Sequence, residues 1–206
     1  MILAGDIGGT NTRLAFFEDK DGGLRALVEE TFPSREHASL DEIVRQFAAA
    51  HKLQISLACF GIAGPIWGGR CETTNLAWIV DAHQLAKGLG IKTVGLINDL
   101  EANAYGISAL APEDFQIVNA GVADNVGNRA VIAAGTGLGE AGLYWDGTRH
   151  RPFACEGGHA DFAPRTDLEV ELFRYLKERF GHVSWERVLS GPGLLNLYEF
   201  LRHAGH

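Results

Sequence analysis

Short apolar runs separated by glycine open the chain. Residues 2–7 and 13–18 are rich in the side chains typical of strands, and Gly-Gly-Thr-Asn at 8–11 separates them. Glycine-rich breaks between such runs indicate a hairpin turn. A third strand is expected from Leu24, so the start of the chain is predicted to be an antiparallel meander.

Helical spacing first appears after Ser39. Ser39 and Glu42 have the spacing of a capping box, and apolar residues then recur three and four positions apart up to His51. Strand and helix patterns alternate further along: a strand over 55–63, a helix to Leu89 capped by Asp81, and a strand over 93–97. This alternation is typical of an α/β fold.

The opening pattern returns in the second half of the chain. A helix is expected from Asp99 to about Leu110, and strand, glycine turn and strand then follow at 131–134, 135–139 and 140–145. A repeat of this kind suggests two related units. We therefore expect two α/β domains, residues 1–110 and 111–206.

Helices are predicted for most of the remaining sequence. One has an apolar face of Leu172, Phe173, Leu176 and Phe180, a short one starts at Ser184, and the last runs from Pro192 to Gly205 with Leu194, Leu197, Tyr198 and Leu201 as its apolar positions. A domain that begins at residue 111 has only part of its sheet and helices by His206. We therefore expect the second domain to be incomplete within this sequence.

Composition narrows the classes of protein. The 206 residues are 46% hydrophobic and 21% charged, which favours a globular protein with an apolar core. The formal net charge is −8 and Lys and Arg form no cluster, which argues against a nucleic-acid partner. No apolar run approaches the ~20 residues that span a bilayer and no export signal is visible, so we expect no membrane partner and a cytoplasmic location. Cys59, Cys71 and Cys155 lie far apart without a CxxC pair, so neither a disulfide framework nor a cysteine-built zinc site is predicted.

Glycine is the outlier in composition, at 26 residues, and it gathers between the apolar runs. In residues 5–11, GDIGGTN, a carboxylate at the end of a strand is followed by two residues without Cβ, a hydroxyl and an amide. Such glycines let backbone N–H groups approach phosphate oxygens, and Asp6 has the chemistry to hold a hydrated Mg²⁺. A Gly-Gly hairpin turn explains the same glycines, but a buried carboxylate is costly without a partner or a metal. Residues 135–139, GTGLG, offer the same chemistry again.

Polar residues after other strands are further candidates. Asp99 opens a helix, where the helix dipole keeps a carboxylate ionised and able to accept a proton, although an N-cap explains it equally well. Glu156 and His159 flank two glycines and have the donors and acceptors that adjacent sugar hydroxyls need, but a surface turn explains them too. A metal pair of Cys155 and His159 lacks further ligands, and Glu186 alone is typical of a solvated helix position.

Six segments together resemble bacterial glucokinases, in order and over essentially the whole chain. They are GDIGGTNTR (5–13), TNLAW (74–78), INDLEA (97–102), AAGTGLG (133–139), EGGHADFAP (156–164) and ERVLSGPGL (186–194). The resemblance implies an actin-like ATPase (ribonuclease H-like) α/β fold, with two domains around a cleft and the second domain incomplete here. It also implies phosphoryl transfer from ATP to the 6-hydroxyl of glucose with Mg²⁺, the first step of glycolysis.

The resemblance assigns roles to individual residues. Those that resemble the first phosphate segment are Gly5, Asp6, Ile7, Gly8, Gly9 and Thr10, and those that resemble the second are Gly135, Thr136 and Gly137. Asp99 resembles the base that takes the proton from the sugar, and the residues that resemble the glucose-binding set are Asn98, Asp99, Glu156, His159 and Glu186. Asp6 is expected to reach Mg²⁺ through water, with no direct protein ligand to a metal. Because no cysteine-rich motif follows EGGH, the chain resembles the branch of the family without zinc. The resemblance also implies a homodimer.

Two other functions stay open at this point. A non-catalytic sugar-binding remnant or regulator of the same fold needs Glu156 and Glu186 but no nucleotide. An actin-like filament protein is disfavoured, because a filament does not need the sugar-binding residues.

Overall fold

Two compact units, residues 1–103 and 104–206, make up the chain. The computed structural model describes residues 1–20, 23–73, 76–122 and 126–205. The units divide within α3 (Asp99–Gly106), whereas the boundary expected from the sequence comes after residue 110. Among the described residues, no helix combines the length and apolar character that crossing a membrane requires.

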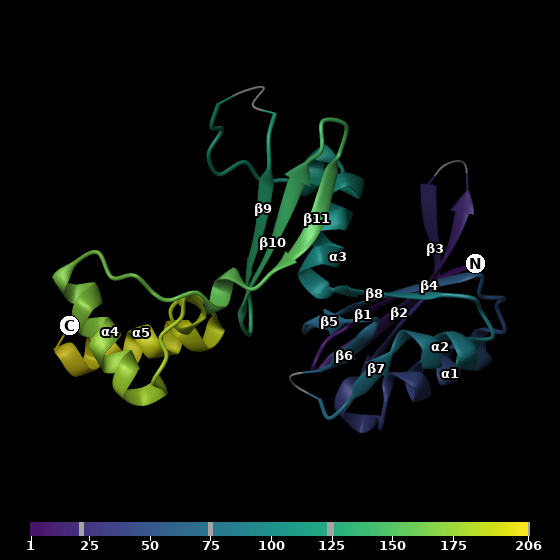
Figure 1. Cartoon of the computed structure of the whole chain (residues 1–206), viewed down its shortest axis with the longest axis horizontal. Coiled ribbons are helices and arrows are strands. Elements are labelled where there is room, and N and C mark those ends of the chain that lie inside the picture. The colour runs from purple at the N-terminus through teal and green to yellow at the C-terminus, as the bar shows by residue number, and fades with distance from the viewer. Residues whose placement is uncertain (21–22, 74–75, 123–125, 206) are drawn as a thin grey trace. The chain divides into compact units, whose positions relative to one another are not determined.

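A five-stranded sheet forms the centre of the first unit (Figure 1). Its order is β3 (Gly23–Pro33), β2 (Asn11–Lys20), β1 (Ile2–Ile7), β4 (Leu57–Ile62) and β8 (Val94–Asn98). The antiparallel pairs β1–β2 and β2–β3 confirm the predicted meander. Strands β1, β4 and β8 run parallel, and their register aligns Ile7, Ile62 and Asn98 at the carboxyl ends. Ligands of open α/β sheets bind beyond this edge, so the sheet places the first candidate residues where a site is expected.

Two helices pack on this sheet, both at the predicted positions. They are α1 (Leu40–His51) and α2 (Ala82–Leu89). The carboxylate of Asp81 accepts hydrogen bonds from the backbone N–H groups of His83 and Gln84 at 2.9 and 3.0 Å, so Asp81 caps α2 as predicted. Phe16 of β2 and Phe47 of α1 are fully buried and stack with ring centroids 4.8 Å apart, which fixes the helix on the sheet.

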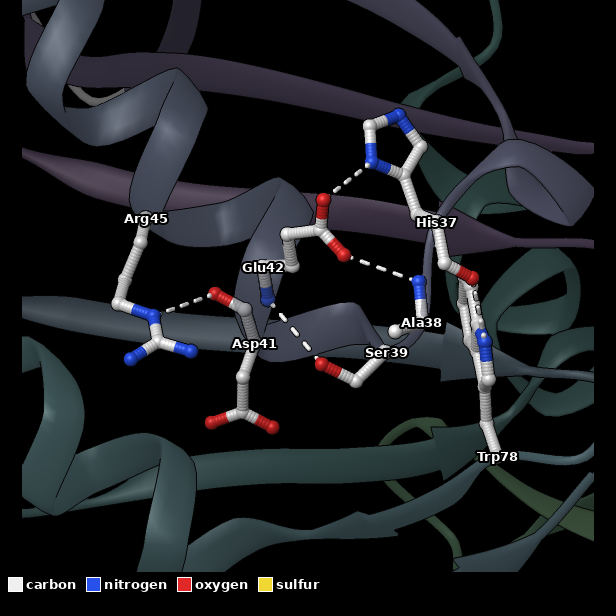
Figure 2. Close-up of polar contacts among 7 residues, drawn as sticks. All are labelled: His37, Ala38, Ser39, Asp41, Glu42, Arg45 and Trp78. Carbon is white, nitrogen blue, oxygen red and sulfur yellow. Dashed lines mark hydrogen bonds and ion pairs between the residues drawn. The ribbon is translucent and has the colours of Figure 1, made fainter.

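The start of α1 is held by its own side chains and by Trp78 (Figure 2). Ser39 Oγ accepts a hydrogen bond from Glu42 N at 3.3 Å, as the capping box predicts. The reciprocal half of the box is different: the Glu42 carboxylate accepts from Ala38 N, at 2.9 Å, one residue before the cap. Trp78 Nε1 donates to the carbonyl oxygen of His37 at 3.1 Å and so ties a distant segment to the helix start.

A small sheet in the first unit was not predicted from the sequence. Its order is β5 (Ile66–Trp67), β6 (Arg70–Glu72) and β7 (Ile79–Asp81). Strands of two or three residues are too short for an alternating pattern, which explains why sequence reasoning misses them.

The second unit has an antiparallel sheet of order β11-β10-β9 (Figure 1). Strands β9 (Arg129–Ala134) and β10 (Leu138–Trp145) are the predicted hairpin and repeat the antiparallel pairing of β1 and β2. Strand β11 (His150–Cys155) was not predicted, because its sequence HRPFAC has no clear alternation and contains a proline. The helix expected from Asp99 to about Leu110 is α3 followed by a 3₁₀ turn over Ile107–Ala109.

Helices α4 (Asp167–Phe180) and α5 (Gly191–Ala204) follow the sheet in sequence. Helix α4 buries Leu172 and Leu176, two of the predicted face residues. The short helix expected from Ser184 is a 3₁₀ turn over Trp185–Arg187.

The predicted apolar face of α5 is correct only at Leu197, which packs against the core of the second unit. Leu194, Tyr198 and Leu201 are exposed, and the helix instead buries Phe200 and Asn196. Asn196 Nδ2 donates a hydrogen bond to the carbonyl oxygen of Arg187 at 2.9 Å, which satisfies the amide inside the unit. A count of apolar positions therefore fails to find the packed face, because the buried polar residue Asn196 lies on it.

Candidate active site

The first glycine segment connects β1 to β2 and is held by hydrogen bonds from a distant residue. Ser34 Oγ donates to the carbonyl oxygen of Gly8 at 2.8 Å and lies 2.9 Å from Thr12 Oγ1, and Ser34 N donates to Thr10 O at 2.9 Å. Ser34 and Thr12 are both fully buried. The segment is therefore a preformed turn whose backbone position is fixed by the buried Ser34.

The backbone angles distinguish the two explanations offered for Gly8 and Gly9. A two-residue type I′ hairpin needs positive φ at both central positions, and neither glycine has one. A Cβ on Gly8 would lie 3.0 Å from the carbonyl oxygen of Asn11, so this glycine serves a close backbone approach. Close approach of backbone N–H groups is the property that a phosphate-binding turn needs.

Asp6 and Asp99 form an acidic pair at the carboxyl edge of the parallel strands. Partial burial raises the pKa of Asp6 above its usual 3.8, the positive charge of Arg13 opposes this shift, and the negative charge of Asp99 adds to it. Asp6 is an exposed residue as a whole, contrary to the expectation of a buried carboxylate, because alternation along β1 turns its side chain away from the core that buries Ile7. Two neighbouring carboxylates offer a place for a cation with its waters.

Helix α3 starts at this edge because β4 has a glycine there. A Cβ on Gly61 would lie 3.0 Å from Ala102 Cβ and 3.7 Å from Asp99 Cα. Asn98 Oδ1 accepts hydrogen bonds from Leu100 N at 2.9 Å and Glu101 N at 3.3 Å, so Asn98 is the main cap of the helix. Asp99 Oδ1 accepts from Leu100 N as well, at 2.9 Å, which leaves the other carboxylate oxygen of Asp99 for a further partner.

The second glycine segment connects β9 to β10 and is bound by residues from the end of the chain. Glu186 Oε2 accepts a hydrogen bond from Leu138 N at 2.9 Å, and Gly191 N donates to Gly135 O at 2.8 Å. A Cβ on Gly137 would overlap the Glu186 carboxylate, whereas one on Gly135 would meet nothing within 4 Å. Gly137 therefore makes room for Glu186, and the surface at Gly135 stays open.

The structure brings three predicted sugar-binding residues together in the second unit. Glu156 Oε2 lies 3.7 Å from His159 Nδ1, and Glu186 Oε1 lies 3.9 Å from His159 Nε2. The side chains of Glu156 and His159 are 65% and 62% exposed, and that of Glu186 is 29% exposed. At these distances the groups are charge neighbours with free hydrogen-bonding capacity, as a site for a polyhydroxyl ligand requires.

Two glycines set the position of this cluster on β10. Glu156 precedes a 3₁₀ turn over Gly157–His159. A Cβ on Gly158 would overlap the carbonyl oxygen of Leu138, and one on Gly157 would overlap the carboxylate of Glu140. The turn therefore lies directly on the strand that leaves the second glycine segment.

Sequence reasoning missed the residues that support the site from a distance. Ser34 acts on a turn 26 positions away, and no local pattern marks it. Ser190 Oγ donates to Glu186 O at 2.7 Å and accepts from Gly193 N at 2.9 Å, so the cap of α5 also fixes the Glu186 turn. The signal for Ser190 was present, because a serine before Gly-Pro at a helix start is a typical N-cap.

Thr74 and Asn75 of the TNLAW segment lie outside the described residues. Within the described ranges, no three His, Cys, Asp or Glu side chains are arranged to hold a metal ion directly. The predicted glucose-binding set is divided between the units, with Asn98 and Asp99 in the first and Glu156, His159 and Glu186 in the second.

Comparisons with known proteins agree with these features. The glucokinase family model matches residues 3–206. A glucokinase of Nostoc punctiforme is 43% identical over 206 residues, which is 98% of this chain and 60% of the relative. The chain thus spans about three fifths of the length of the curated relatives it matches.

Solved structures show the same fold. Glucokinase from an Antarctic psychrotroph superposes with a TM-score of 0.83 at 34% identity, over 99% of this chain and 65% of that one. A ROK family glucokinase from Streptomyces griseus, solved with glucose and AMPPNP, has a TM-score of 0.61 at 19% identity, over 98% of this chain and 61% of that one, and shares the fold. The predicted α/β actin-like ATPase fold is confirmed, and the chain belongs to the glucokinase family.

Proposed function

We propose that this chain contributes the sugar-binding and phosphate-binding residues of an ATP-dependent glucokinase. The reaction is transfer of the terminal phosphoryl group of ATP to the 6-hydroxyl of glucose, giving glucose 6-phosphate and ADP. The observation that carries the proposal is the Glu156, His159 and Glu186 cluster, which is joined to the second glycine segment through Glu186 and Leu138 N. Family membership and the glucose and AMPPNP complex of the Streptomyces griseus relative support it.

Sugar recognition falls to carboxylates, an imidazole and an amide. Each hydroxyl of a sugar both donates and accepts, and carboxylates accept while the imidazole of His159 does either. An epimer with one hydroxyl displaced leaves one of these groups without its sugar partner. Strict selection of glucose over its epimers follows from this chemistry.

Asp99 is the proposed base. Phosphoryl transfer passes through a loose transition state in which positioning and charge neutralisation matter more than base strength. Asp99 therefore acts mainly by orienting the sugar hydroxyl, and it receives the proton as the oxygen–phosphorus bond forms. Its place at the first turn of α3 sets the carboxylate beside the positive end of the helix dipole.

The two glycine segments are the proposed phosphate cradles. Backbone N–H groups at Gly8 to Thr10 and at Gly135 to Gly137 supply hydrogen bonds, and Thr10 and Thr136 add exposed hydroxyls. Mg²⁺, when bound with ATP, neutralises phosphate charge. Asp6 fits this ion through a water molecule, because its carboxylate lies near the negative charge of Asp99 and because, among the described residues, no three His, Cys, Asp or Glu side chains are arranged to hold a metal directly.

A homodimer and a cytoplasmic location remain part of this proposal. Sedimentation velocity at rising protein concentration measures the dimer directly. A single monomeric species at all concentrations would contradict it.

The function is tested by glucose phosphorylation with ATP and Mg²⁺ together with calorimetric titration of glucose. Turnover of glucose in preference to mannose and galactose supports the proposal. Glucose binding without any phosphorylation contradicts it and favours the sugar-binding regulator.

A further inference from the structure

A concave region lies within residues 104–206. It is a cavity of about 900 Å³ between the end of α3, the segment after it and the β9–β11 sheet. Ala104 and Leu143, which are 2% and 4% exposed, are its best-buried lining residues. None of the candidate active-site residues lines it, so it is not part of the site described above.

Three arginines line this cavity, and among the described residues two of them, Arg129 and Arg149, form no ion pair with an acidic side chain. Arg129 opens β9, and Arg149 immediately precedes β11. The third, Arg151, pairs with Asp146. A chain with a net charge of −8 thus keeps two uncompensated guanidinium groups at one cavity. Because both residues are exposed, an anion from solvent can reach their guanidinium groups.

Aromatic side chains line the same cavity. The strand register places Arg129 opposite Leu143, and Trp145 opposite His150. Alternation along β10 puts Leu143 and Trp145 on one face of the sheet, so Arg129 and Trp145 share that face. Tyr105 and Phe115, both lining residues, are 54% and 50% exposed. Exposed aromatic rings beside guanidinium groups suit a ligand that has a flat apolar part and an anionic part.

Hydrogen bonds fix the backbone that carries the two arginines. Asp146 Oδ1 accepts from Thr148 N and Arg149 N, each at 2.9 Å, and so shapes the β10–β11 turn. Asn128 Oδ1 accepts from Trp145 N at 2.9 Å, which ties the residue before Arg129 to the same turn. A preformed backbone lowers the ordering cost of binding.

We propose that this cavity binds a phosphate monoester with a flat apolar group, with Arg129 and Arg149 as the ligands of the phosphate. Guanidinium groups match phosphate oxygens in geometry, and two of them balance the charge of a phosphate dianion. The aromatic lining holds the organic part. The proposal is independent of the glucokinase reaction and uses none of its residues.

The test is calorimetric titration of the chain with inorganic phosphate and with phenyl phosphate at low ionic strength. We expect phenyl phosphate to bind more tightly, and Arg129→Gln and Arg149→Gln to weaken it about tenfold each. Arg174→Gln is the matched control, because it removes one positive charge from an exposed position on α4. Trp145→Leu should reduce the advantage of phenyl phosphate over inorganic phosphate. Circular dichroism confirms that each variant is folded.

Three results would overturn the proposal. One is the absence of binding heat up to about 10 mM phenyl phosphate. Another is an unchanged dissociation constant in the Arg129→Gln/Arg149→Gln double variant, which assigns the phosphate to the glycine segments. The third is equal affinity for inorganic phosphate and phenyl phosphate, which removes the role of the aromatic lining.

Discussion

The carboxylate of Glu186 accepts a hydrogen bond from the backbone N–H of Leu138, at 2.9 Å, across 48 positions of sequence. Its other oxygen lies 3.9 Å from Nε2 of His159. One side chain therefore contacts both the second glycine segment and the proposed sugar-binding cluster. A substitution in the second glycine segment is therefore expected to alter the sugar-binding cluster, and a substitution in the cluster is expected to alter the glycine segment.

Removal of this carboxylate should weaken both functions at once. Glu186→Ala leaves Leu138 N without its partner and takes one acceptor from the sugar cluster. A hydrogen bond to a charged group contributes about 1.5–3 kcal/mol, so glucose affinity should fall about tenfold or more. Calorimetry with glucose and with ATP measures the two losses. Glu171→Ala, at an exposed position on α4, is the control, and equal glucose affinities in the two variants would contradict the account.

The glycines of the second segment should separate stability from binding. Gly137→Ala displaces the Glu186 carboxylate from Leu138 N, and loss of this hydrogen bond should destabilise the fold by about 1–3 kcal/mol. Gly135→Ala meets open space at a φ that is not positive, so its free energy of unfolding should change little. Its methyl group should still lower ATP affinity, because it covers the proposed phosphate approach. Urea unfolding and ATP titration are measured for both variants. If Gly135→Ala binds ATP as tightly as the wild type, Gly135 does not contact phosphate.

The sequence predicts most of this framework wherever local signals are strong. The meander, the β9–β10 hairpin and helices α1 and α2 follow from alternating patterns and from caps such as Ser39 and Asp81. The buried face of α5 was missed because Asn196 satisfies its amide through Arg187 O, a contact that depends on the folded chain. The support of the glycine segments by Ser34 and Ser190 was missed for the same reason. Sequence thus identifies candidate residues, whereas the tertiary structure shows what holds them.

Ser34 should be a strong determinant of stability in the first unit. Ser34→Ala removes a buried hydroxyl that bonds Gly8 O at 2.8 Å and contacts Thr12 Oγ1 at 2.9 Å. Leaving such groups unpaired costs about 1–3 kcal/mol each. Ser108→Ala, whose hydroxyl is exposed, should change the free energy of unfolding by less than about 0.5 kcal/mol. A difference of zero between the two variants in urea unfolding would show that Ser34 does not hold the first glycine segment.

Asp6 should lower stability at neutral pH. Its pKa is raised in the folded chain above the usual 3.8, so the folded state holds the proton more tightly than the unfolded state. This contribution to stability is present below about pH 3.8 and is lost as the pH rises through the folded pKa. Asp6→Asn should therefore be more stable than the wild type at pH 7, and the gain should shrink as the pH falls. Asp19→Asn, at an exposed end of β2, is the control. An equal gain in the free energy of unfolding in this variant would show that the effect does not come from the surroundings of Asp6.

The role of Asp99 is the central claim, and one paired measurement tests it directly. Glucose phosphorylation and calorimetric glucose binding are compared for the wild type, Asp99→Asn and the exposed control Asp19→Asn. Removal of a positioned base costs about 10²–10⁴-fold in rate, so Asp99→Asn should lose turnover by at least a hundredfold while glucose still binds and Asp19→Asn stays active. Full turnover in Asp99→Asn would contradict the account.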